Sequence, residues 1–254
     1  MDIFSILGLV IGVAFILWAQ AIEGGNAGQL MQITAAMIVF GGTAGAIVGS
    51  FPMSDIKIAT FALKDILSPP KVDLEKLISE IVGFATKARK EGVIVLEKEA
   101  KHASDSLLTM GLETVADGAD PSLVQGMMEN QINQLEEKVT KASKVYEAAG
   151  AYSPTFGIIG AVMGLIQVMQ NLSDPSKLGA GIAVAFVATV YGLFVANLIF
   201  IPISTRLKAN YQQIFLAKEV MLEGILAIQA GESPALIERK LQSYIIDRPQ
   251  EKKE

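Results

Sequence analysis

Long uncharged blocks alternate with amphipathic stretches along this chain. A membrane-crossing helix needs about 20 apolar residues to cover about 30 Å of hydrocarbon. Four segments meet that requirement, namely residues 3–22, 31–51, 152–172 and 178–203. The pattern therefore predicts an all-α membrane protein with four transmembrane helices.

The segment between the second and third spans has helical periodicity. In "DLEKLISEIVGFATKARKEG" the apolar residues recur at i, i+3, i+4 and i+7, and Asp73 is placed to cap the helix start. A longer helix is expected from Asp120-Pro121, and with no comparable breaker before Gly150 and Pro154 it runs into the third span. After the fourth span, two amphipathic helices are separated by residues 231–234.

These patterns predict four consecutive segments. Residues 1–51 form the first two transmembrane helices, and residues 52–151 form a helical cytoplasmic domain. Residues 152–203 form the third and fourth transmembrane helices, and residues 204–254 form a helical cytoplasmic tail whose last residues are disordered.

The bases predict the orientation in the membrane. None of the 21 Lys and Arg precedes Lys57, and the two short loops between paired spans hold only Lys177. Cytoplasmic segments carry the excess of Lys and Arg, so both termini and the long middle segment are expected in the cytoplasm. Residues 19–21 also resemble a signal-peptide cleavage site, but the start "MDIFS" carries an acid where a signal peptide needs a base.

Composition narrows the function classes. The chain has 51% hydrophobic and only 19% charged residues, a net charge of −5 and no cysteine. Nucleic-acid binding would require clustered Lys and Arg, and thiol catalysis, thiolate metal sites and disulfides all require cysteine. The high hydrophobic fraction and low charged fraction agree with a membrane protein. The composition argues against nucleic-acid binding and against cysteine-dependent catalysis, metal binding or disulfides.

Small residues recur every fourth position within the spans. Examples are Gly8 with Gly12, the stretch "GGTAGAIVG", and Gly160 with Gly164. This spacing places small residues on one helix face, where helices approach closely in lipid. Packing within one chain is one explanation, but the amount of such surface predicts a homo-oligomer.

No catalytic constellation is present. The lone His102 in "EAKHASD" is interpreted as a solvated helix residue, and the chain has no HExxH motif, P-loop or dinucleotide-binding turn. We therefore expect no enzyme activity, no cofactor and no bound metal.

The spans also have no titratable Asp, Glu, His or Lys in their interiors. Ion pumps and proton relays normally hold such a group at membrane depth. The polar residues present are hydroxyls and amides, including Thr155 and Thr189, which can coordinate an ion but do not titrate at neutral pH. If the protein conducts ions, a partner must supply the carboxylate.

Two prolines stand near the cytoplasmic ends of the third and fourth spans. Because these spans run in opposite directions, Pro154 and Pro202 are expected at about the same depth, where each removes a backbone donor. Simple helix termination is the alternative. With Thr155 beside one proline and Thr189 halfway along the facing helix, the pattern predicts a hinge and a polar stripe.

"SPTFGIIGAVMGLI" and "GAGIAVAFVATVYGLFVANLIFIPIS" resemble the paired third and fourth spans of the MotA/PomA flagellar stator proteins, within the superfamily that includes TolQ and ExbB. The resemblance covers the whole chain, including "KARKEGVIVLEKE" in the middle segment. It implies a pentameric ring around two copies of a MotB/PomB-type partner, a single-span protein with a membrane aspartate and a peptidoglycan-binding domain.

The resemblance also implies roles for individual residues. Thr155 and Thr189 would line the ion path, and Pro154 and Pro202 would couple ion binding to movement. Gly157, Gly160 and Gly164 would pack the third span against a neighbouring helix. Arg89 and Glu97 would form a charged pair that faces FliG of the rotor.

Spacing alone allows a different explanation of Arg89 and Glu97. They are eight residues apart, just over two helical turns, so both project from one face if the helix continues through Gly92. A solvated, salt-bridged surface would give the same pattern, and the neighbours Lys90 and Glu91 offer competing candidates.

The expected function is that of an ion-conducting stator subunit in the bacterial inner membrane, with protons as the expected ion and sodium as the alternative. An ExbB/TolQ-type energiser of outer-membrane processes is the alternative function. Those relatives resemble three-span proteins with an outside N-terminus, whereas this chain is predicted to have four spans and a cytoplasmic N-terminus. A stand-alone transporter or membrane enzyme would need a titratable or catalytic group that the spans do not contain. A purely structural oligomer would leave the prolines and threonines unexplained.

Overall fold

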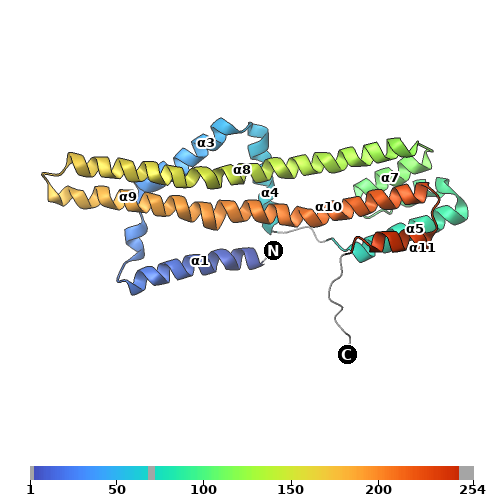
Figure 1. The fold of residues 1–254 in the computed structure, drawn as a ribbon, viewed down its shortest axis with the longest axis horizontal. Coiled ribbons are helices and arrows are strands. Elements are labelled where there is room, and N and C mark those ends of the chain that lie inside the picture. The colour runs from blue at the N-terminus through green and yellow to red at the C-terminus, as the bar shows by residue number, and fades with distance from the viewer. Residues whose placement is uncertain (1–2, 68–71, 246–254) are drawn as a thin grey trace, which may run out of the picture. The chain divides into compact units, whose positions relative to one another are not determined.

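The computed structural model describes residues 3–67 and 72–245, and these are helical with short connections (Figure 1). The α-helices are α1 (Ile3–Ile22), α2 (Ile33–Ala36), α3 (Gly42–Ser50), α4 (Met53–Leu67), α5 (Leu74–Glu91), α6 (Leu96–Ala100), α7 (Ser106–Ala116), α8 (Pro121–Gln170), α9 (Pro175–Val195), α10 (Ile201–Gln229) and α11 (Pro234–Gln242). Two 3₁₀ turns, Ala27–Leu30 and Val93–Val95, precede α2 and α6. The all-α prediction is confirmed for the described residues.

Two wide π-helical turns interrupt otherwise α-helical spans. Met37–Gly41 joins α2 to α3, and Ala196–Phe200 joins α9 to α10. Both junctions are continuous, so the second span is one helix and residues 175–229 form another. Such turns are frequent at functional sites and cannot be read from hydrophobic periodicity.

Three described helical stretches are long and apolar enough to cross a membrane. They lie in Ile33–Ser50, Pro121–Gln170 and Leu178–Gln229, while the apolar stretch Leu7–Ile22 is shorter. The predicted second, third and fourth spans coincide with the three long stretches. The expectation that the helix starting after Asp120 runs into the third span is confirmed, because α8 is unbroken over 50 residues.

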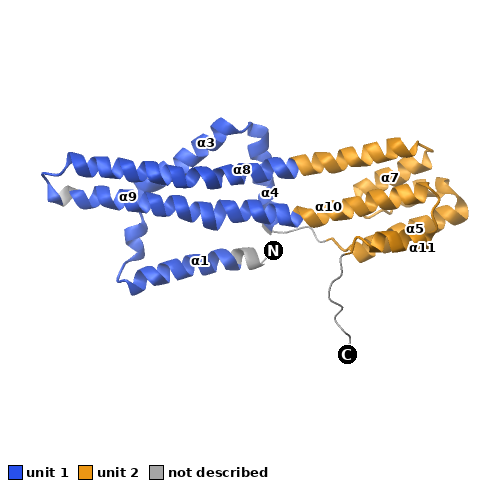
Figure 2. Cartoon of the chain, viewed as in Figure 1, with its two compact units in different colours: residues 1–69, 138–210 blue, residues 70–137, 211–254 orange. Residues whose placement is uncertain are grey.

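Packing divides the chain into two compact units (Figure 2). The first contains residues 1–69 and 138–210, and the second contains residues 70–137 and 211–254. Both α8 and α10 pass from one unit to the other, because each helix continues without a break beyond its apolar span. The four segments predicted from the sequence are bounded by the ends of the spans, whereas these two units are bounded by packing. The predicted segment boundaries therefore stay a prediction.

The second unit has its own apolar core. Side chains from α5, α6, α7, α11 and the adjoining parts of α8 and α10 are fully buried in it, including Ile81, Leu96, Leu107, Leu112, Ile225 and Ile237. Asp73 caps α5 as predicted, since its Oδ1 accepts a hydrogen bond from the Lys76 backbone N–H at 3.1 Å.

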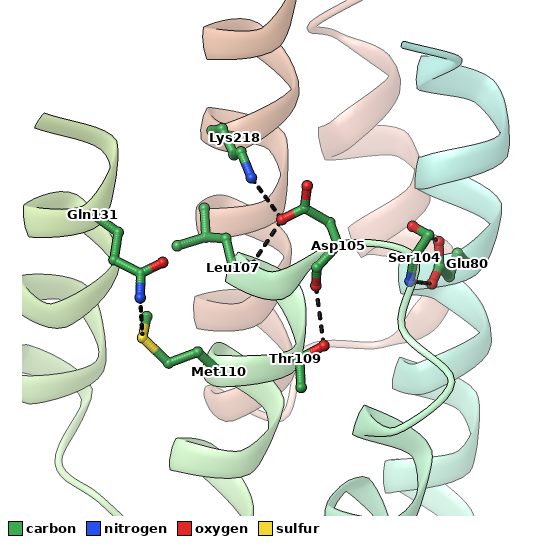
Figure 3. Close-up of polar contacts among 8 residues, drawn as sticks. All are labelled: Glu80, Ser104, Asp105, Leu107, Thr109, Met110, Gln131 and Lys218. Carbon is green, nitrogen blue, oxygen red and sulfur yellow. Dashed lines mark hydrogen bonds and ion pairs between the residues drawn. The ribbon is translucent and has the colours of Figure 1, made fainter. Parts of the chain in front are cut away.

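Polar contacts hold the start of α7 within this unit (Figure 3). The Asp105 carboxylate caps the helix by accepting from the Leu107 N–H at 2.8 Å, and the Lys218 ammonium of α10 lies 2.6 Å from the same oxygen. Glu80 of α5 accepts hydrogen bonds from both the backbone N–H and the hydroxyl of Ser104, at 2.8 and 2.6 Å. The connection before α7 is therefore fixed to α5 and α10.

Candidate functional site

The α8 and α9 backbones approach closely along a row of glycines. A methyl group added at Gly157 would lie 2.9 Å from the Ala188 carbonyl oxygen, and one at Gly192 would lie 2.6 Å from that of Ser153. Farther along, a methyl group at Gly164 would lie 2.5 Å from the Gly181 carbonyl oxygen. Side chains larger than hydrogen do not fit at these positions, so the glycines set the spacing of the two helices.

Gly160 belongs to the same row. A methyl group there would lie 2.5 Å from the Ala188 Cβ, so Gly160 also packs on α9. The structure thus places the three glycines predicted for helix packing against one neighbouring helix of the same chain.

The two threonines expected on the ion path lie near one level of this helix pair. Thr189 is the neighbour of Gly157, where an added methyl group would lie 3.3 Å from the Thr189 Cα, and Thr155 is two residues from Gly157. Each hydroxyl donates within its own helix, Thr155 to the Tyr152 carbonyl at 2.6 Å and Thr189 to that of Ala185 at 3.1 Å. Their oxygens therefore keep lone pairs to offer to a donor or a cation.

The expectation that the two prolines share one depth is wrong. Pro154 lies beside Gly192, where an added methyl group would be 3.1 Å from the Pro154 Cα. Pro202 is ten residues farther along the same continuous helix, and its neighbour Ile201 lies against Gly150, four residues from Pro154 on α8. The offset is therefore about 6 Å counted along α8 and about 15 Å counted along the facing helix. The physical reason is that both helices extend beyond the spans, so the span ends seen in hydropathy do not mark equivalent levels.

The two prolines also perturb their helices differently. Pro154 is within the unbroken α8. Pro202 is the second residue after the π-turn, whose closing bond runs from the Ile201 N–H to the Ala196 carbonyl. A wide turn relieves the clash between a proline ring and the preceding turn of backbone, which accounts for its position there.

Arg89 and Glu97, in the second unit, lie on different helices. α5 ends at Glu91, and Gly92 adopts φ +87°, a left-handed value that favours glycine and reverses the chain. The idea that one continuous helix presents both charges is therefore wrong. Arg89 and Glu97 are both exposed, and the Lys87–Glu99 ion pair at 2.6 Å holds α5 beside α6.

Comparison with known proteins identifies the family. The model of the MotA/TolQ/ExbB proton channel family matches residues 99–244, more than half of the chain. This chain belongs to the MotA/TolQ/ExbB family. The match includes the α8–α9 glycine row, both threonines and both prolines.

Relatives within the MotA/TolQ/ExbB family match at full length. Motility protein A of Helicobacter pylori is 38% identical over 245 residues, covering 96% of this chain and 95% of the relative. Chemotaxis protein PomA of Vibrio alginolyticus is 31% identical, covering 96% of each chain.

Solved structures in the same family have this fold. The C. jejuni MotAB structure superposes with a TM-score of 0.91 at 31% identity, with full coverage of both chains. The flagellar MotAB stator complex from Bacillus subtilis gives 0.87 at 29% identity and 95% coverage of both chains.

One contact in this MotA/TolQ/ExbB protein was missed by sequence reasoning. The Tyr191 hydroxyl donates to the Leu30 carbonyl at 2.5 Å and accepts from the Gln32 N–H at 3.2 Å. These two backbone groups lie at the non-helical step before α2, where backbone groups without a helical partner need another one. Tyrosine in an apolar span was the only available signal, and it does not reveal a partner 159 residues away.

A second missed contact is a buried hydroxyl pair. Ser143 of α8 and Ser204 of α10 are 0% and 2% exposed, and their oxygens are 2.9 Å apart. The pair lies just beyond Pro202 and cross-links the helices that continue the third and fourth spans. Neither serine stands out in the sequence, because both have charged residues nearby.

Proposed function

We propose that this chain is the ring-forming subunit of a flagellar motor stator, which couples ion flow through the bacterial inner membrane to torque on the rotor. The observation that carries the proposal is a close-packed pair of spans with two hydroxyls near one level and no Asp, Glu, His or Lys in the interiors of the described spans. Full-length similarity to motility proteins, at 95% or more of each chain, supports a motor over an ExbB/TolQ-type role.

The proposed assembly has five copies of this chain, each with four spans and with both termini in the cytoplasm. They surround two copies of a MotB/PomB-type partner that carries a membrane aspartate and binds peptidoglycan. The solved structures similar to this chain are named as MotAB complexes, which supports such a partner. The position of 20 of the 21 bases outside the two short loops supports the orientation.

The hydroxyls assist the partner's carboxylate in this mechanism. The Thr155 and Thr189 oxygens accept hydrogen bonds from a hydrated proton or coordinate a cation as it reaches the aspartate. Protons are the proposed ion. Loading and release of the aspartate then change its charge, and with it the contacts that favour one ring position over the next.

The prolines act at two levels in this proposal. Pro154 lies beside Gly192, close to both threonines, so it is placed to respond when the aspartate changes charge. Pro202 and the π-turn before it lie farther along, at the start of the helix that leads into the cytoplasmic unit. The helix would shift at Pro154 when the aspartate changes charge, and it would bend at Pro202 to accommodate that shift.

The exposed charges of the α5–α6 hairpin face the rotor in this proposal. Arg89 and Glu97 would contact FliG, whose complementary charges they push as the ring turns. Lys87 and Glu99 pair with each other and so hold the hairpin instead of contacting the rotor.

Charge reversal tests the rotor contact. Arg89→Glu should abolish most torque at high load while ion conduction through the activated complex stays near normal. Lys90→Glu, the next exposed base on α5, is the matched control and should keep more torque. An equal loss of conduction in Arg89→Glu would place Arg89 in the folding or the ion path and not at the rotor.

Threonine replacement tests the ion path. Thr189→Ala should lower motor speed at a given proton gradient, and Thr189→Ser, which keeps the hydroxyl, should restore most of it. Unchanged speed in Thr189→Ala across the gradient would remove this residue from the path. Repeating the measurement with a sodium gradient and no proton gradient decides the ion.

A further inference from the structure

The helix α4 exposes a mixed apolar and basic face. Met53, Lys57, Phe61 and Lys64 follow one another at i, i+4, i+8 and i+11, so they form a single stripe. Phe61 is 79% exposed and Met53 is 56% exposed. The opposite face of α4 packs on its own chain, yet the Phe61 side chain is exposed. Such an exposed aromatic side chain indicates that a lipid or another molecule covers this face.

The opposite face of α4 is fixed to its own chain. Ala59, Ala62 and Ile66 are buried there. The Tyr146 hydroxyl of α8 donates to the Ala59 carbonyl at 2.8 Å, and the Asn210 amide of α10 donates to the Asp65 carbonyl at 3.3 Å. These bonds set the rotation of α4, so Phe61 cannot turn inward.

The start of α4 lies at the cytoplasmic end of a span. α3 ends at Ser50, and α4 begins three residues later at Met53. The Ser50 hydroxyl lies 3.1 Å from the Tyr152 hydroxyl, at the start of the predicted third span. α4 therefore begins at headgroup depth and lies beside α8 and α10 (Figure 1).

The sequence next to the span ends is basic in an otherwise acidic protein. Residues 52–67, 138–151 and 204–210 together hold seven bases and three acids, whereas the whole chain has a net charge of −5. Two of the acids have partners within the chain, since Asp55 accepts from the Ser54 hydroxyl and Glu147 pairs with Lys208. Among the described residues, neither Lys57 nor Lys64 has an ion-pair partner.

We propose that the outward face of α4 is a binding site for anionic phospholipid headgroups of the cytoplasmic leaflet. Lys57 and Lys64 donate hydrogen bonds to lipid phosphate oxygens, and Phe61 and Met53 enter the boundary between headgroups and acyl chains. The inference requires only that α2 and α3 span the membrane and that their α4 end faces the cytoplasm. It does not depend on the motor function.

A neighbouring copy of the chain fits this face less well. Two unpaired ammonium groups would need acids on the neighbour, and the acids of this basic region are few and already engaged. A membrane surface instead supplies many negative charges beside an apolar layer, which matches the alternation of lysine with phenylalanine and methionine.

Fluorescence quenching by brominated lipids tests the site. Trp18 is the only tryptophan, so Trp18→Phe combined with Phe61→Trp gives one reporter on α4. The purified complex is reconstituted in vesicles containing brominated phosphatidylglycerol or brominated phosphatidylcholine at equal mole fraction. Both lipids should quench Trp at position 61, and the anionic lipid should quench it at lower mole fraction.

The lysines should account for this preference. Replacing Lys57 and Lys64 by Gln should reduce the relative affinity for the anionic lipid by about fivefold for each lysine. Lys76→Gln with Lys98→Gln, two exposed lysines of the second unit, is the charge-matched control and should leave the preference intact.

Three results would overturn the proposal. They are no quenching by either lipid, equal quenching by both, and a preference that survives loss of both lysines. The first result would mean that water or a second copy of the chain covers Phe61. If the tryptophan variant does not fold, phosphatidylglycerol retained by the wild-type protein and by the Lys57→Gln, Lys64→Gln protein is compared by native mass spectrometry, and equal retention rejects the site.

Discussion

Gly192→Ala should loosen the pair of helices that carries the threonines. The added methyl group would lie 2.6 Å from the Ser153 carbonyl oxygen, 3.1 Å from the Pro154 Cα and 3.2 Å from the Gly157 Cα. All three neighbours are backbone atoms, so none can rotate away. Reaching the ordinary contact distance of 3.4 Å requires a local separation of up to 0.8 Å.

The expected penalty combines two opposing effects. Overpacking of this kind costs about 1–3 kcal/mol, and a gap of about 0.5–1 Å forfeits a quarter to a half of each affected dispersion contact. Alanine is the better helix former by about 0.8–1 kcal/mol. Because the neighbours are rigid, we expect a net loss of about 1–2 kcal/mol, which is roughly a 5–30-fold change in the equilibrium.

Thermal unfolding of the purified complex and motor speed in cells together measure this effect. Gly192→Ala should lower the unfolding temperature by a few degrees and slow the motor, because the displacement falls beside Pro154. Gly179→Ala on the same helix is the matched control, since no heavy atom lies within 4 Å of the added methyl group. If Gly192→Ala melts like this control and its motors run at normal speed, the glycine row does not set the helix spacing.

Three further changes probe other parts of the molecule. Tyr191→Phe leaves two backbone groups before α2 without their partner, so we expect a loss of about 1–3 kcal/mol in thermal unfolding. Lys218→Met separates a mostly buried ion pair with Asp105, and the second unit should lose about 1–3 kcal/mol. Hydrogen bonds from the Ser122 hydroxyl and backbone N–H hold the pKa of Asp120 below its usual range. The contribution of Asp120 to folding stability is therefore present above its unfolded-state pKa and lost as pH falls through its folded-state pKa. Asp120→Asn removes this contribution, so unfolding of the variant should depend less on acid pH.

The first two of these changes have a control of matched chemistry. Tyr152→Phe removes a hydroxyl whose bond to Ser50 is exposed, and it should have a smaller effect than Tyr191→Phe. Lys87→Met breaks a more exposed ion pair with Glu99 and should cost under about 1 kcal/mol. Equal effects within either pair, or an Asp120→Asn protein with unchanged acid unfolding, would contradict the corresponding argument.

Helices were predictable where one local signal dominates. The Asp73 cap of α5, the start of α8 after Asp120 and the break between α10 and α11 all rest on residues within a few positions of each helix end. Capping side chains, prolines and glycines act over one turn, so the sequence contains the whole cause. The glycine spacing in α8 likewise predicts a close-packed face, because the period of the helix is fixed.

Features that depend on a second helix were not predictable. The α5–α6 reversal depends on Gly92 adopting a left-handed conformation, which a glycine in a helical pattern allows but does not require. The Tyr191 bonds and the Ser143–Ser204 pair join residues far apart in the chain. Hydroxyl groups in a sequence give no sign of such partners, whereas apolar periodicity does indicate a buried face.

The offset between the prolines changes how the spans connect to the helical segments that continue them. If both prolines lay at one depth, a single hinge would serve both helices. Pro154 instead lies at the level of Gly192, while Pro202 follows Ile201, which packs on Gly150 about one turn of α8 away, and is next to the buried Ser143–Ser204 pair. The stretch of helix between Gly192 and Pro202 contains the π-turn. A displacement that begins near the threonines must therefore pass through this turn before it reaches the helix that enters the second unit.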